Sequence, residues 1–457
     1  MLSLWDLGVS TQLLNMMYKM NKSASVTVNT PNGCTNQFCV ERIVKQGTVL
    51  GPGLCSSSTA EFADENVGGV AVGSLSIGSL LYVDDMNLLC MNAVETQKTH
   101  FRAMSFSKRK RLKYKQKKCL LMIANKKKQD AVPVLDIDGT PMAQANLIKV
   151  LGDLFNDKCN NKDLIDDRLR RANLCIVNSM SLCNELSLGI YSLQTLLVIY
   201  RAVFLSSVLF NAQAWSNIKK TEFERLQVVQ LKYLKRTIKA PPSCPNAGTF
   251  LEFGILPIAY EIHVRQLNFL HHILNLESSD PVYMMLMELR KFSSEKNWAN
   301  DIIELCEQYD ISQDDEEICS MSKHAWKKFI KEKVRAVAFR TLVEESSSMK
   351  KTKHLKYETF CCQSYLTSMS PSDAGILFRA RLHSINCKAN MPGASQDRSC
   401  RLCGKSVETQ EHIVNCWYVK GEYIDVTLGN DTEADPGILR ELRIRLRRFE
   451  ELRTELT

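Results

Sequence analysis

The sequence predicts an α+β fold, with antiparallel strands and helices in its first third and mostly helices after that. Short apolar runs, separated by Asn-Gly and Asp-Gly turns, extend to about residue 158, and this pattern is typical of β-hairpins. From about residue 160 the apolar residues recur at helical spacing. A group of cysteine and histidine residues follows near residue 400, before a last amphipathic segment. We therefore expect a mixed unit, a long helical region and a small module built on the Cys/His group.

The first 158 residues alternate helices with hairpins. The turn pairs Asn32-Gly33 and Asp138-Gly139 each separate two runs of alternating polarity, which is the strongest short-range signal for a hairpin. In order, we expect a helix at 4–20, a hairpin at 25–44, a helix after residue 52, a hairpin through 70–77, strands on both sides of 83–84, a helix at 92–118, a strand at 118–123, the Asp138-Gly139 turn and a strand at 150–155.

The remaining residues predict long helices joined by short loops. Thr221-x-x-Glu224 has the pattern of a capping box, and Pro241-Pro242 ends that helix. Ser346–Lys353 is predicted to be a linker because a serine run precedes lysines. Helices are expected at 163–178, 192–215, 221–239, 258–276 and 374–384, and a closing amphipathic helix with Ile438, Leu439, Leu442, Leu446, Phe449 and Leu452 on one face.

Charge and cysteine usage restrict the class of protein. The formal net charge of +9 favours an anionic partner, and the excess is local: residues 108–118 read KRKRLKYKQKK. Seventeen cysteines are scattered through apolar segments, so we expect a reducing, intracellular location in the nucleus or cytoplasm rather than a secreted disulfide scaffold. The most apolar stretch, residues 191–210, contains Gln194, Arg201 and three serines, which predicts a buried helix and no membrane span.

A pair of adjacent carboxylates stands out in the first third. Tyr82-Val83-Asp84-Asp85 joins two short apolar runs, and two neighbouring acids in such a setting are costly to bury without a positive partner. A divalent metal is a suitable partner, because hard cations bind carboxylate oxygens and bridge phosphates. The alternative is a solvated hairpin tip, in which the two acids have no further role.

The Cys/His group has the spacing of a zinc site. Cys400-x2-Cys403-x8-His412-x3-Cys416 places three thiols and an imidazole within seventeen residues, and they suit one tetrahedral Zn²⁺. Gly404 allows the turn after the second cysteine. Buried free cysteines are the alternative. Five cations lie close by in the sequence: Arg379, Arg381, Lys388, Arg398 and Arg401. They favour a nucleic-acid partner, whereas a purely structural zinc clip is the other interpretation.

Three further motifs accompany the carboxylate pair in a fixed order. Gln46-Gly47 opens KQGTVLGP, Lys118 begins KCLLM, and Gly152 lies in VLGDLF. Together with YVDD, these segments resemble motifs B, C, D and E of reverse transcriptases. Their forms are similar to those of the non-LTR, LINE-like retrotransposon branch. The Cys/His group resembles the C-terminal CCHC zinc knuckle of the same elements.

The resemblance implies both a domain plan and an activity. The activity is RNA-directed DNA synthesis with Mg²⁺ or Mn²⁺, with dNTPs as substrates, an RNA template and a DNA primer or target, and no membrane. The plan consists of a partial reverse-transcriptase palm, a helical thumb, a helical connector, a CCHC zinc knuckle and a C-terminal amphipathic helix, at residues 1–158, 159–290, 291–395, 396–420 and 421–457.

The resemblance also assigns roles around the carboxylate pair. Asp84 is the metal ligand of this hairpin, and Asp85 matches a second family carboxylate with a weaker part in metal binding. Tyr82 packs near the primer terminus. Gln46 hydrogen-bonds to nucleotide and template, and Gly47 lets the backbone approach them closely. The alternative for Gly47 is that it only shapes a turn.

Lys118 and Gly152 match the two later motifs. Lys118, or its neighbour Lys117, is a cation able to neutralise or protonate the leaving pyrophosphate, and Leu151-Gly152-Asp153 belongs to the hairpin that holds the primer strand. Lys118 has an equally plain alternative as one solvated charge among many.

One family motif has no counterpart. Motif A, an apolar strand ending in an Asp that shares both metals with motif C, should precede the first helix, and Asp6 in LSLWDLGVS has the wrong context. With one side of the metal clamp, we expect the polypeptide not to polymerise on its own, and we expect Asp84 and Asp85 to be exposed. A non-catalytic nucleic-acid-binding remnant and a zinc-dependent scaffold, in which YVDD is accidental, are the alternative functions. No endonuclease pattern of carboxylates and lysine follows the knuckle.

Two basic segments leave alternatives open. Three interpretations fit residues 108–118: a contact with a nucleic-acid backbone, a nuclear localisation signal, or a solvated helix face. Tyr114 within them stacks on a base or packs inside the protein. The other segment is a helix with four cations: Lys232, Lys235, Arg236 and Lys239. It follows a duplex groove or is an ordinary amphipathic helix.

Overall fold

The structure is a computed structural model with a mixed α+β composition. It describes residues 4–5, 8–22, 24–40, 50–64, 68–128, 130–185, 192–390, 397–419, 422, 424 and 436–455. Of the chain, 56% is helical and 10% is in strands that form small sheets, so the α+β prediction is confirmed at this coarse level. No helix in these ranges is long and apolar enough to cross a membrane.

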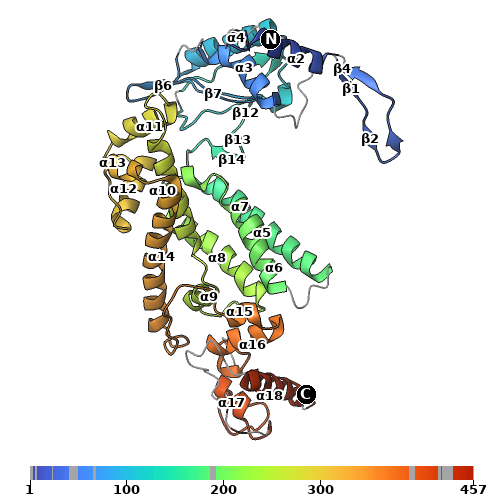
Figure 1. Cartoon of the computed structure of the whole chain (residues 1–457), viewed down its shortest axis with the longest axis vertical. Helices are drawn as coiled ribbons and strands as arrows, with labels where there is room; N and C mark the ends of the chain where they lie inside the picture. The colour runs from blue at the N-terminus through green and yellow to red at the C-terminus, as the bar shows by residue number, and fades with distance from the viewer. Residues whose placement is uncertain are drawn as a thin grey trace. The chain divides into compact units, whose positions relative to one another are not determined.

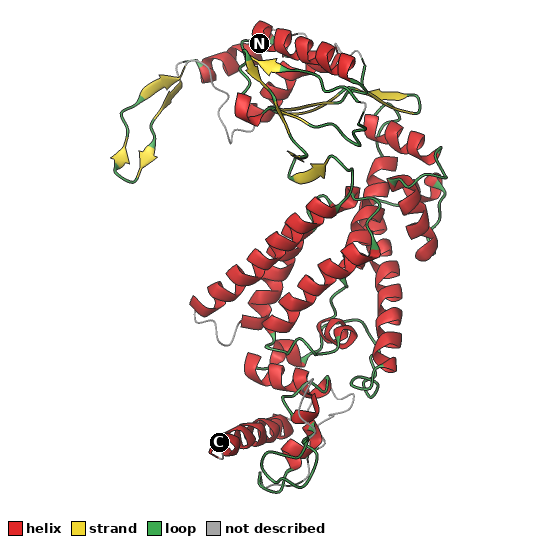
Figure 2. Cartoon of the chain, turned by 180° about the vertical axis from the view of Figure 1, so that it is seen from behind, coloured by secondary structure: helices red, strands yellow, loops and turns green. Residues whose placement is uncertain are grey.

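The chain forms two compact units. Unit 1 comprises Met1–Leu151, Phe155–Cys159 and Met287–Lys291, and unit 2 comprises Gly152–Leu154, Asn160–Leu286 and Phe292–Thr457. The strands, yellow in Figure 2, are concentrated in the N-terminal residues, and the helices of unit 2 follow in green to red in Figure 1.

Unit 1 combines helices with two-stranded sheets. Its helices are α2 (Thr11–Asn21), α3 (Leu50–Asp64), α4 (Ala93–Lys110) and the 3₁₀ turn η1 (Gln116–Lys118). Its strands are β1 (Ala24–Val26), β2 (Asn29–Thr30), β3 (Gly33–Cys34), β4 (Phe38–Val40), β5 (Val70–Val72), β6 (Leu75–Ile77), β7 (Ser79–Tyr82), β8 (Asp85–Leu88), β9 (Leu120–Leu121), β10 (Asp136–Ile137), β11 (Thr140–Pro141), β12 (Ala143–Gln144) and β13 (Leu147–Val150). The next strand, β14 (Asp153–Asn156), spans the boundary between the units.

The predicted hairpins are present, with one shift of register. Ile137 pairs with Thr140, so Asp138-Gly139 forms the expected two-residue turn with both φ angles positive. In the first hairpin Thr30 pairs with Gly33, and the turn is therefore Pro31-Asn32, one residue before the predicted Asn32-Gly33. The Thr30 hydroxyl donates to the Gly33 carbonyl at 2.7 Å and closes this turn. Outside it, β1 pairs with β4.

Unit 2 is built of helices. They are α5 (Lys162–Glu185), α6 (Ser192–Ile199), the π-helical turn η2 (Tyr200–Phe204), α7 (Leu205–Val208), the 3₁₀ turn η3 (Ala212–Ala214), α8 (Lys220–Thr237), α9 (Asn246–Phe253), α10 (Ile258–Leu274), α11 (Pro281–Arg290, whose end belongs to unit 1), α12 (Trp298–Gln308), α13 (Asp315–Ser320), α14 (Lys323–Ser348), α15 (Tyr365–Ser368), α16 (Pro371–Arg381), the 3₁₀ turn η4 (Lys388–Asn390), α17 (Gln410–Asn415) and α18 (Pro436–Glu455).

A larger and a smaller hydrophobic core lie within the described part of unit 2. The larger core is formed by α5, α8, α9, α16 and the segments between them, together with Ile258 and Ile262 of α10 and Leu342 of α14. Helix α14 packs along α10, as Figure 1 shows. The smaller core holds the Cys/His region against α18, through Ile413, Val414, Leu442 and Phe449. Helix α16 contributes Leu377 and Phe378 to the larger core and Ala380 to the smaller one.

The predicted helix at 192–215 is wrong beyond Val208. The α-helix changes to a π-helical turn at Tyr200, because Tyr200 and Phe204 pack against Tyr233, with ring centroids 5.4 and 5.1 Å from its ring. It then ends at Val208, and Asn211 adopts a left-handed conformation (φ +58°) that a continuing helix does not allow. Apolar spacing alone does not record this break.

The predicted linker Ser346–Lys353 is also wrong. The serines form the last turn of α14, and Ser346 and Thr352 are fully buried at 1% and 0% exposure. The Thr352 hydroxyl donates to the Ser346 carbonyl at 2.7 Å and the Met349 N–H donates to the same carbonyl, whereas the buried Ser346 hydroxyl has no hydrogen-bond partner among the described residues. The serine run therefore belongs to the last turn of a buried helix. The contacts that bury this turn come from elsewhere in the fold and cannot be read from the neighbouring sequence.

One predicted helix end, one capping residue and one helix face are corrected. The helix predicted at 92–118 ends at Lys110, since Arg111 turns left-handed at φ +56°. The capping glutamate of α8 is Glu222, whose carboxylate accepts from the Lys219 N–H at 2.8 Å, instead of Glu224. In α18, Leu442 and Phe449 are buried as expected and Leu446 and Leu452 are half-buried, but Ile438 is 39% exposed, and the side chain of Leu439 lies outside the described residues.

A buried ion pair joins three parts of unit 2. Glu252 on α9 is 0% exposed, and its carboxylate accepts from the Arg381 Nε on α16 at 3.1 Å. Two phenols, Tyr357 and Tyr365, donate to the same carboxylate at 2.7 and 2.6 Å. Burial, followed by the negative charge of Glu252, raises the pKa of both phenols well above its ordinary value, so they stay protonated donors. The carboxylate is therefore saturated with donors, as a buried charge requires.

Removing the charge of Glu252 should destabilise unit 2. Glu252→Gln leaves Arg381 buried without a counter-charge, and we expect the free energy of unfolding to fall by about 3–5 kcal/mol. Glu358→Gln, an exposed carboxylate in the same segment of the fold, serves as the matched control and should change it by less than about 0.5 kcal/mol. Urea unfolding of both variants measures the difference. Equal stability of the two variants would contradict this role of Glu252.

Candidate functional site

The carboxylate pair lies at the tip of the β7–β8 hairpin. Ser79 pairs with Leu88 and Tyr82 with Asp85, so Val83 and Asp84 form a two-residue turn. On the inner face Leu81, Met86 and Leu88 pack against a small core of Phe62, Ala103 and Phe106 from α3 and α4. The alternation of the strand places Tyr82 and Leu80 on the opposite, exposed face. The apolar runs on both sides of the acids thus fix the hairpin.

The first turn residue is held in a strained conformation. Val83 has φ +56°, which is unusual for a β-branched residue and costs of order 1–3 kcal/mol. The Cys55 thiol of α3 donates to the Val83 carbonyl at 3.3 Å and holds the turn against that helix. Burial, and then the negative charge of Asp84, raises the pKa of this thiol, so it stays a donor at neutral pH. The helix and the turn together determine where Asp84 and Asp85 project.

Both carboxylates are exposed, as predicted. Asp84, Asp85 and Tyr82 all belong to the exposed class, and Tyr82 is 61% exposed. Among the described residues, no third Asp, Glu, Cys or His joins the pair in a metal-sized group. Carboxylate oxygens suit a divalent cation such as Mg²⁺ in type, but two of them supply only part of a coordination shell. The predicted residues Gln46 and Gly47 lie outside the described residues, as does Asp6.

The basic residues at the end of α4 and just after it divide into paired and exposed ones. Arg109 and Lys110 both form ion pairs with Glu61 of α3. Tyr114 packs inside the unit, where its hydroxyl donates to the Ala103 carbonyl at 3.3 Å, so the packing alternative holds for this residue. Lys118 lies in the 3₁₀ turn η1 with an exposed side chain, as does Lys117, and the structure does not distinguish the two.

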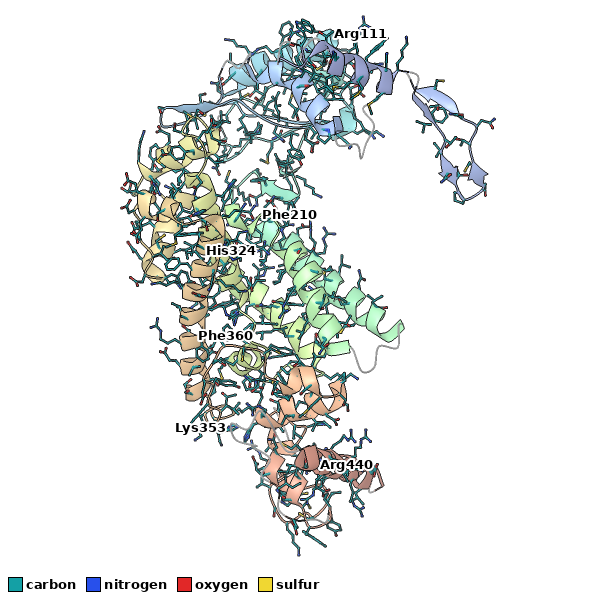
Figure 3. All side chains as sticks on the ribbon, viewed as in Figure 1. Arg111, Phe210, His324, Lys353, Phe360 and Arg440 are labelled. Carbon is teal, nitrogen blue, oxygen red and sulfur yellow. The ribbon has the colours of Figure 1, made fainter. Side chains whose placement is uncertain are left out.

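Gly152 and Asp153 belong to a tightly packed corner of unit 2. A Cβ at Gly152 would lie 2.9 Å from the Phe210 ring (labelled in Figure 3), and its φ of +97° also requires glycine. Asp153 is buried, pairs with the fully buried Arg168, and accepts from the Asn211 amide at 3.0 Å. Arg168 was not singled out from the sequence, because its partner lies fifteen residues earlier and no local pattern links them.

The four predicted zinc ligands come together in unit 2. The ligand atoms of Cys400, Cys403, His412 and Cys416 all lie within 4.8 Å of one another, near the roughly 3.8 Å that follows from Zn–S bonds of about 2.3 Å. Cys400 and Cys403 flank a tight turn, in which the Gly404 N–H donates to the Cys400 carbonyl at 2.8 Å. Thr409 caps α17 and so positions its first-turn His412, while Cys416 ends the same helix.

The cluster is electrostatically prepared for a cation. Burial opposes ionisation of Cys403, but the backbone N–H groups of Lys405 and Ser406 and the His412 ring lower its pKa to about 6. Burial, and then repulsion from Cys400 and Cys403, raises the pKa of Cys416 to about 12. One thiolate is therefore available at neutral pH, and a metal must displace a proton from Cys416. This donor set could bind zinc.

Glu408 stabilises the loop that carries Cys400. It is 0% exposed, and its carboxylate accepts from the Lys388 and Arg401 backbone N–H groups, each at 2.9 Å. The Arg401 side chain adds an ion pair. Burial alone would raise the pKa of Glu408, but the Arg401 and backbone donors lower it below its ordinary value. Because Arg401 follows Cys400 directly, Glu408 fixes the backbone that carries the first ligand.

Several cations expected to contact nucleic acid are engaged within the protein. Arg381 is 1% exposed and pairs with Glu252, so its predicted place near the knuckle surface is wrong. Lys235 is 6% exposed and donates to the Pro242 and Cys244 carbonyls at 2.8 and 2.6 Å, so it is not part of an exposed helix face. Arg236, Lys239 and Arg398 are exposed.

Comparison with known proteins adds no family assignment. The chain matches no protein-family model and no curated protein.

Loss of one ligand should abolish metal binding. Cys403→Ser removes a thiol whose pKa is lowered to about 6, and we expect zinc content to fall from about one ion per chain to well below half. Cys361→Ser, at an exposed cysteine outside the cluster, should retain the ion. Elemental analysis of both purified variants measures this. Full zinc content in Cys403→Ser would contradict the assignment of the cluster.

Removing the charge of Glu408 should weaken zinc binding. Glu408→Gln should weaken zinc binding by about 10- to 100-fold at pH 7, as loss of a supporting contact does, while Glu411→Gln at a part-exposed carboxylate should not.

The stability that Glu408 contributes should depend on pH. The folded pKa of Glu408 lies below the unfolded value of about 4.3, so its stabilisation is complete above that pH and is lost as pH falls through the folded pKa. The stability difference from wild type should therefore shrink below about pH 4.3, as unfolding at pH 7 and pH 4 would measure.

Proposed function

We propose that the chain carries the carboxylate hairpin, thumb and zinc knuckle of a non-LTR retrotransposon reverse transcriptase, an RNA-directed DNA polymerase. The ordered motifs around Gln46-Gly47, Asp84-Asp85, Lys118 and Gly152 motivate the proposal. The single structural observation that supports it best is the strained, exposed turn at Val83-Asp84, which presents two adjacent carboxylates at the end of a well-packed hairpin.

The exposed turn suits phosphoryl transfer for two reasons. Strain of this kind persists where the surrounding structure enforces it, and it is found most often at functional sites. The carboxylates of Asp84 and Asp85 would hold Mg²⁺ or Mn²⁺, which in this chemistry stabilises charge on the attacking and leaving oxygens. Tyr82 is exposed beside them and offers an aromatic surface to a primer terminus.

The cations of both units suit an RNA template and a DNA primer or target. In unit 1, Lys117 and Lys118 are exposed after α4, and in unit 2, Arg236 and Lys239 are exposed at the end of α8. Lysine and arginine side chains that reach phosphates supply most of the sequence-independent affinity of such proteins. The dNTP substrates would be bound through the same metal and through the motif B residues.

A second candidate function is binding of nucleic acid without polymerisation. The observation that favours it is the incomplete shell at Asp84-Asp85: the described residues provide no further carboxylate there. In this case the exposed cations and the zinc knuckle would hold RNA or DNA, and the hairpin would carry no chemistry.

One pair of variants distinguishes the candidates. We expect the purified chain to bind RNA with an affinity that falls as salt rises, and we test whether it extends a DNA primer on an RNA template with Mg²⁺ or Mn²⁺. If it extends, Asp84→Asn should reduce the rate by at least about 10²-fold, because a metal ligand is lost. Asp138→Asn, at the exposed tip of the β10–β11 hairpin, is the matched control and should extend normally.

The outcomes separate clearly. Extension that Asp84→Asn leaves unchanged contradicts the role of the hairpin. Salt-dependent RNA binding without extension in either metal supports the second candidate. Absence of RNA binding contradicts both.

A further inference from the structure

A groove of about 780 Å³ lies in unit 2 where the end of α8 meets α16 and α18. Its walls come from four parts of the chain that are distant in sequence: residues 239–243, α16, residues 384–390 and α18, with Ile413 of α17 below them. In Figure 3, the labelled Arg440 marks α18, the helix that forms one of these walls. The groove is separate from the zinc ligands, none of which lines it.

The rim of the groove is cationic. Lys239, Arg379, Arg443 and Arg447 line it, against a single carboxylate, Glu451. Two of the cations are fixed in place: the Arg379 Nη1 donates to the Lys239 carbonyl at 3.0 Å, and Arg443 pairs with Asp373 at 2.8 Å. Lys239 and Arg447 are exposed and form no ion pair with any described residue. The rim therefore has two positioned guanidinium groups and two cations available to an incoming anion.

The floor of the groove is apolar. Its accessible apolar surface comes from Ile376 and Leu446, which are half-buried, and Ile385, Ile413 and Phe449 are buried beneath them. Ser243 and Asn386 add exposed polar groups at the edge. Such a floor offers nothing to a bare phosphate, but it can cover the face of a planar ring. The combination suits a ligand that carries both negative charge and a flat apolar surface.

We propose that this groove binds single-stranded nucleic acid, with phosphates on the cationic rim and one unstacked base over the apolar floor. This inference rests on the proposed function, because it names the form of nucleic acid that unit 2 holds. Charge complementarity favours a polyanion, and the recessed floor favours one whose bases are free to turn inward. Bases in a duplex remain stacked inside and do not reach such a floor.

The zinc cluster is coupled to the groove through α17. His412 of this six-residue helix belongs to the ligand set, and the adjacent Ile413 belongs to the groove floor. Cys387, which also lines the groove, is buried in the same small core as the ligands Cys400 and Cys416. A metal bound by the cluster would restrain α17 and with it Ile413, so the binding experiment is carried out on the zinc-loaded chain.

The experiment measures anisotropy of a labelled 12-nucleotide single-stranded RNA with the full chain. Arg447→Gln should weaken binding by about three- to tenfold and reduce the slope of log K against log salt by about 0.7, the value for one phosphate contact on a single strand. Arg448→Gln is the matched control, since it removes the same charge from the next, exposed residue of α18, which does not line the groove. It should change affinity by less than twofold.

A second variant tests the floor without changing charge. Ser243→Trp places a large side chain at the exposed edge of the groove. It should weaken RNA binding by at least about fivefold, while the affinity of the chain for polyphosphate should stay unchanged. Zinc content and thermal unfolding confirm that each variant is folded. Duplex RNA of the same length should bind the chain equally before and after this substitution.

The results that overturn the proposal are distinct from failure of the proposed function. If Arg447→Gln and Ser243→Trp bind the single strand as wild type does, the groove is not its site, although RNA binding elsewhere stands. If polyphosphate or a polyglutamate peptide of equal charge displaces the RNA as well as an unlabelled strand does, no base is recognised and the inference fails. If the unmodified chain binds no RNA, both the inference and the proposed function fail.

Discussion

The buried ion pair between Glu252 and Arg381 is the interaction on which the arrangement of unit 2 depends. Two charges without water are stable only when every remaining lone pair has a donor, and Tyr357 and Tyr365 supply those donors. This requirement is directional, unlike apolar packing, which tolerates sliding of one helix on another. It therefore determines the position of α16 relative to α9. Because α16 contributes to both hydrophobic cores, the ion pair also sets where the smaller core begins.

The zinc module depends on α16 in turn. Gln410, at the start of α17, is 3% exposed and donates its amide to the Ala380 carbonyl at 2.7 Å, which connects the ligand-bearing helix to the end of α16. A small module of this size has little apolar surface to bury and would gain stability from a metal bound by its Cys/His cluster. The smaller core, the metal cluster and the contact with Ala380 therefore act together, and α18 closes the module through Leu442 and Phe449.

Features that are determined by residues close together in the sequence were predicted well, and features that are determined by tertiary contacts were not. The β7–β8 hairpin and the cluster of Cys400, Cys403, His412 and Cys416 were found because turn residues and ligand spacing lie within a few residues of one another. Arg381 and Lys235 were misplaced on the surface because their acceptors, Glu252 and the carbonyls after Pro241, are set by tertiary packing. The break of the helix after Ile199 arises likewise from contact with Tyr233 on another helix. Whether Gln46 and Gly47 lie near Asp84 is not a local property either, and it stays a prediction.

The carboxylates that stabilise the fold differ from those that could bind a cation in whether their lone pairs are already engaged by donors. Glu252 and Glu408 are fully buried and saturated with donors, and Asp153 is held by Arg168 and Asn211. A metal could bind any of these three only by displacing arginine from a buried site, which would leave that cation uncompensated. Asp84 and Asp85 are exposed, and no ion pair or side-chain hydrogen bond engages either carboxylate within the described chain. The energetic cost of cation binding is therefore lower at the Val83-Asp84 turn than at these three held acids.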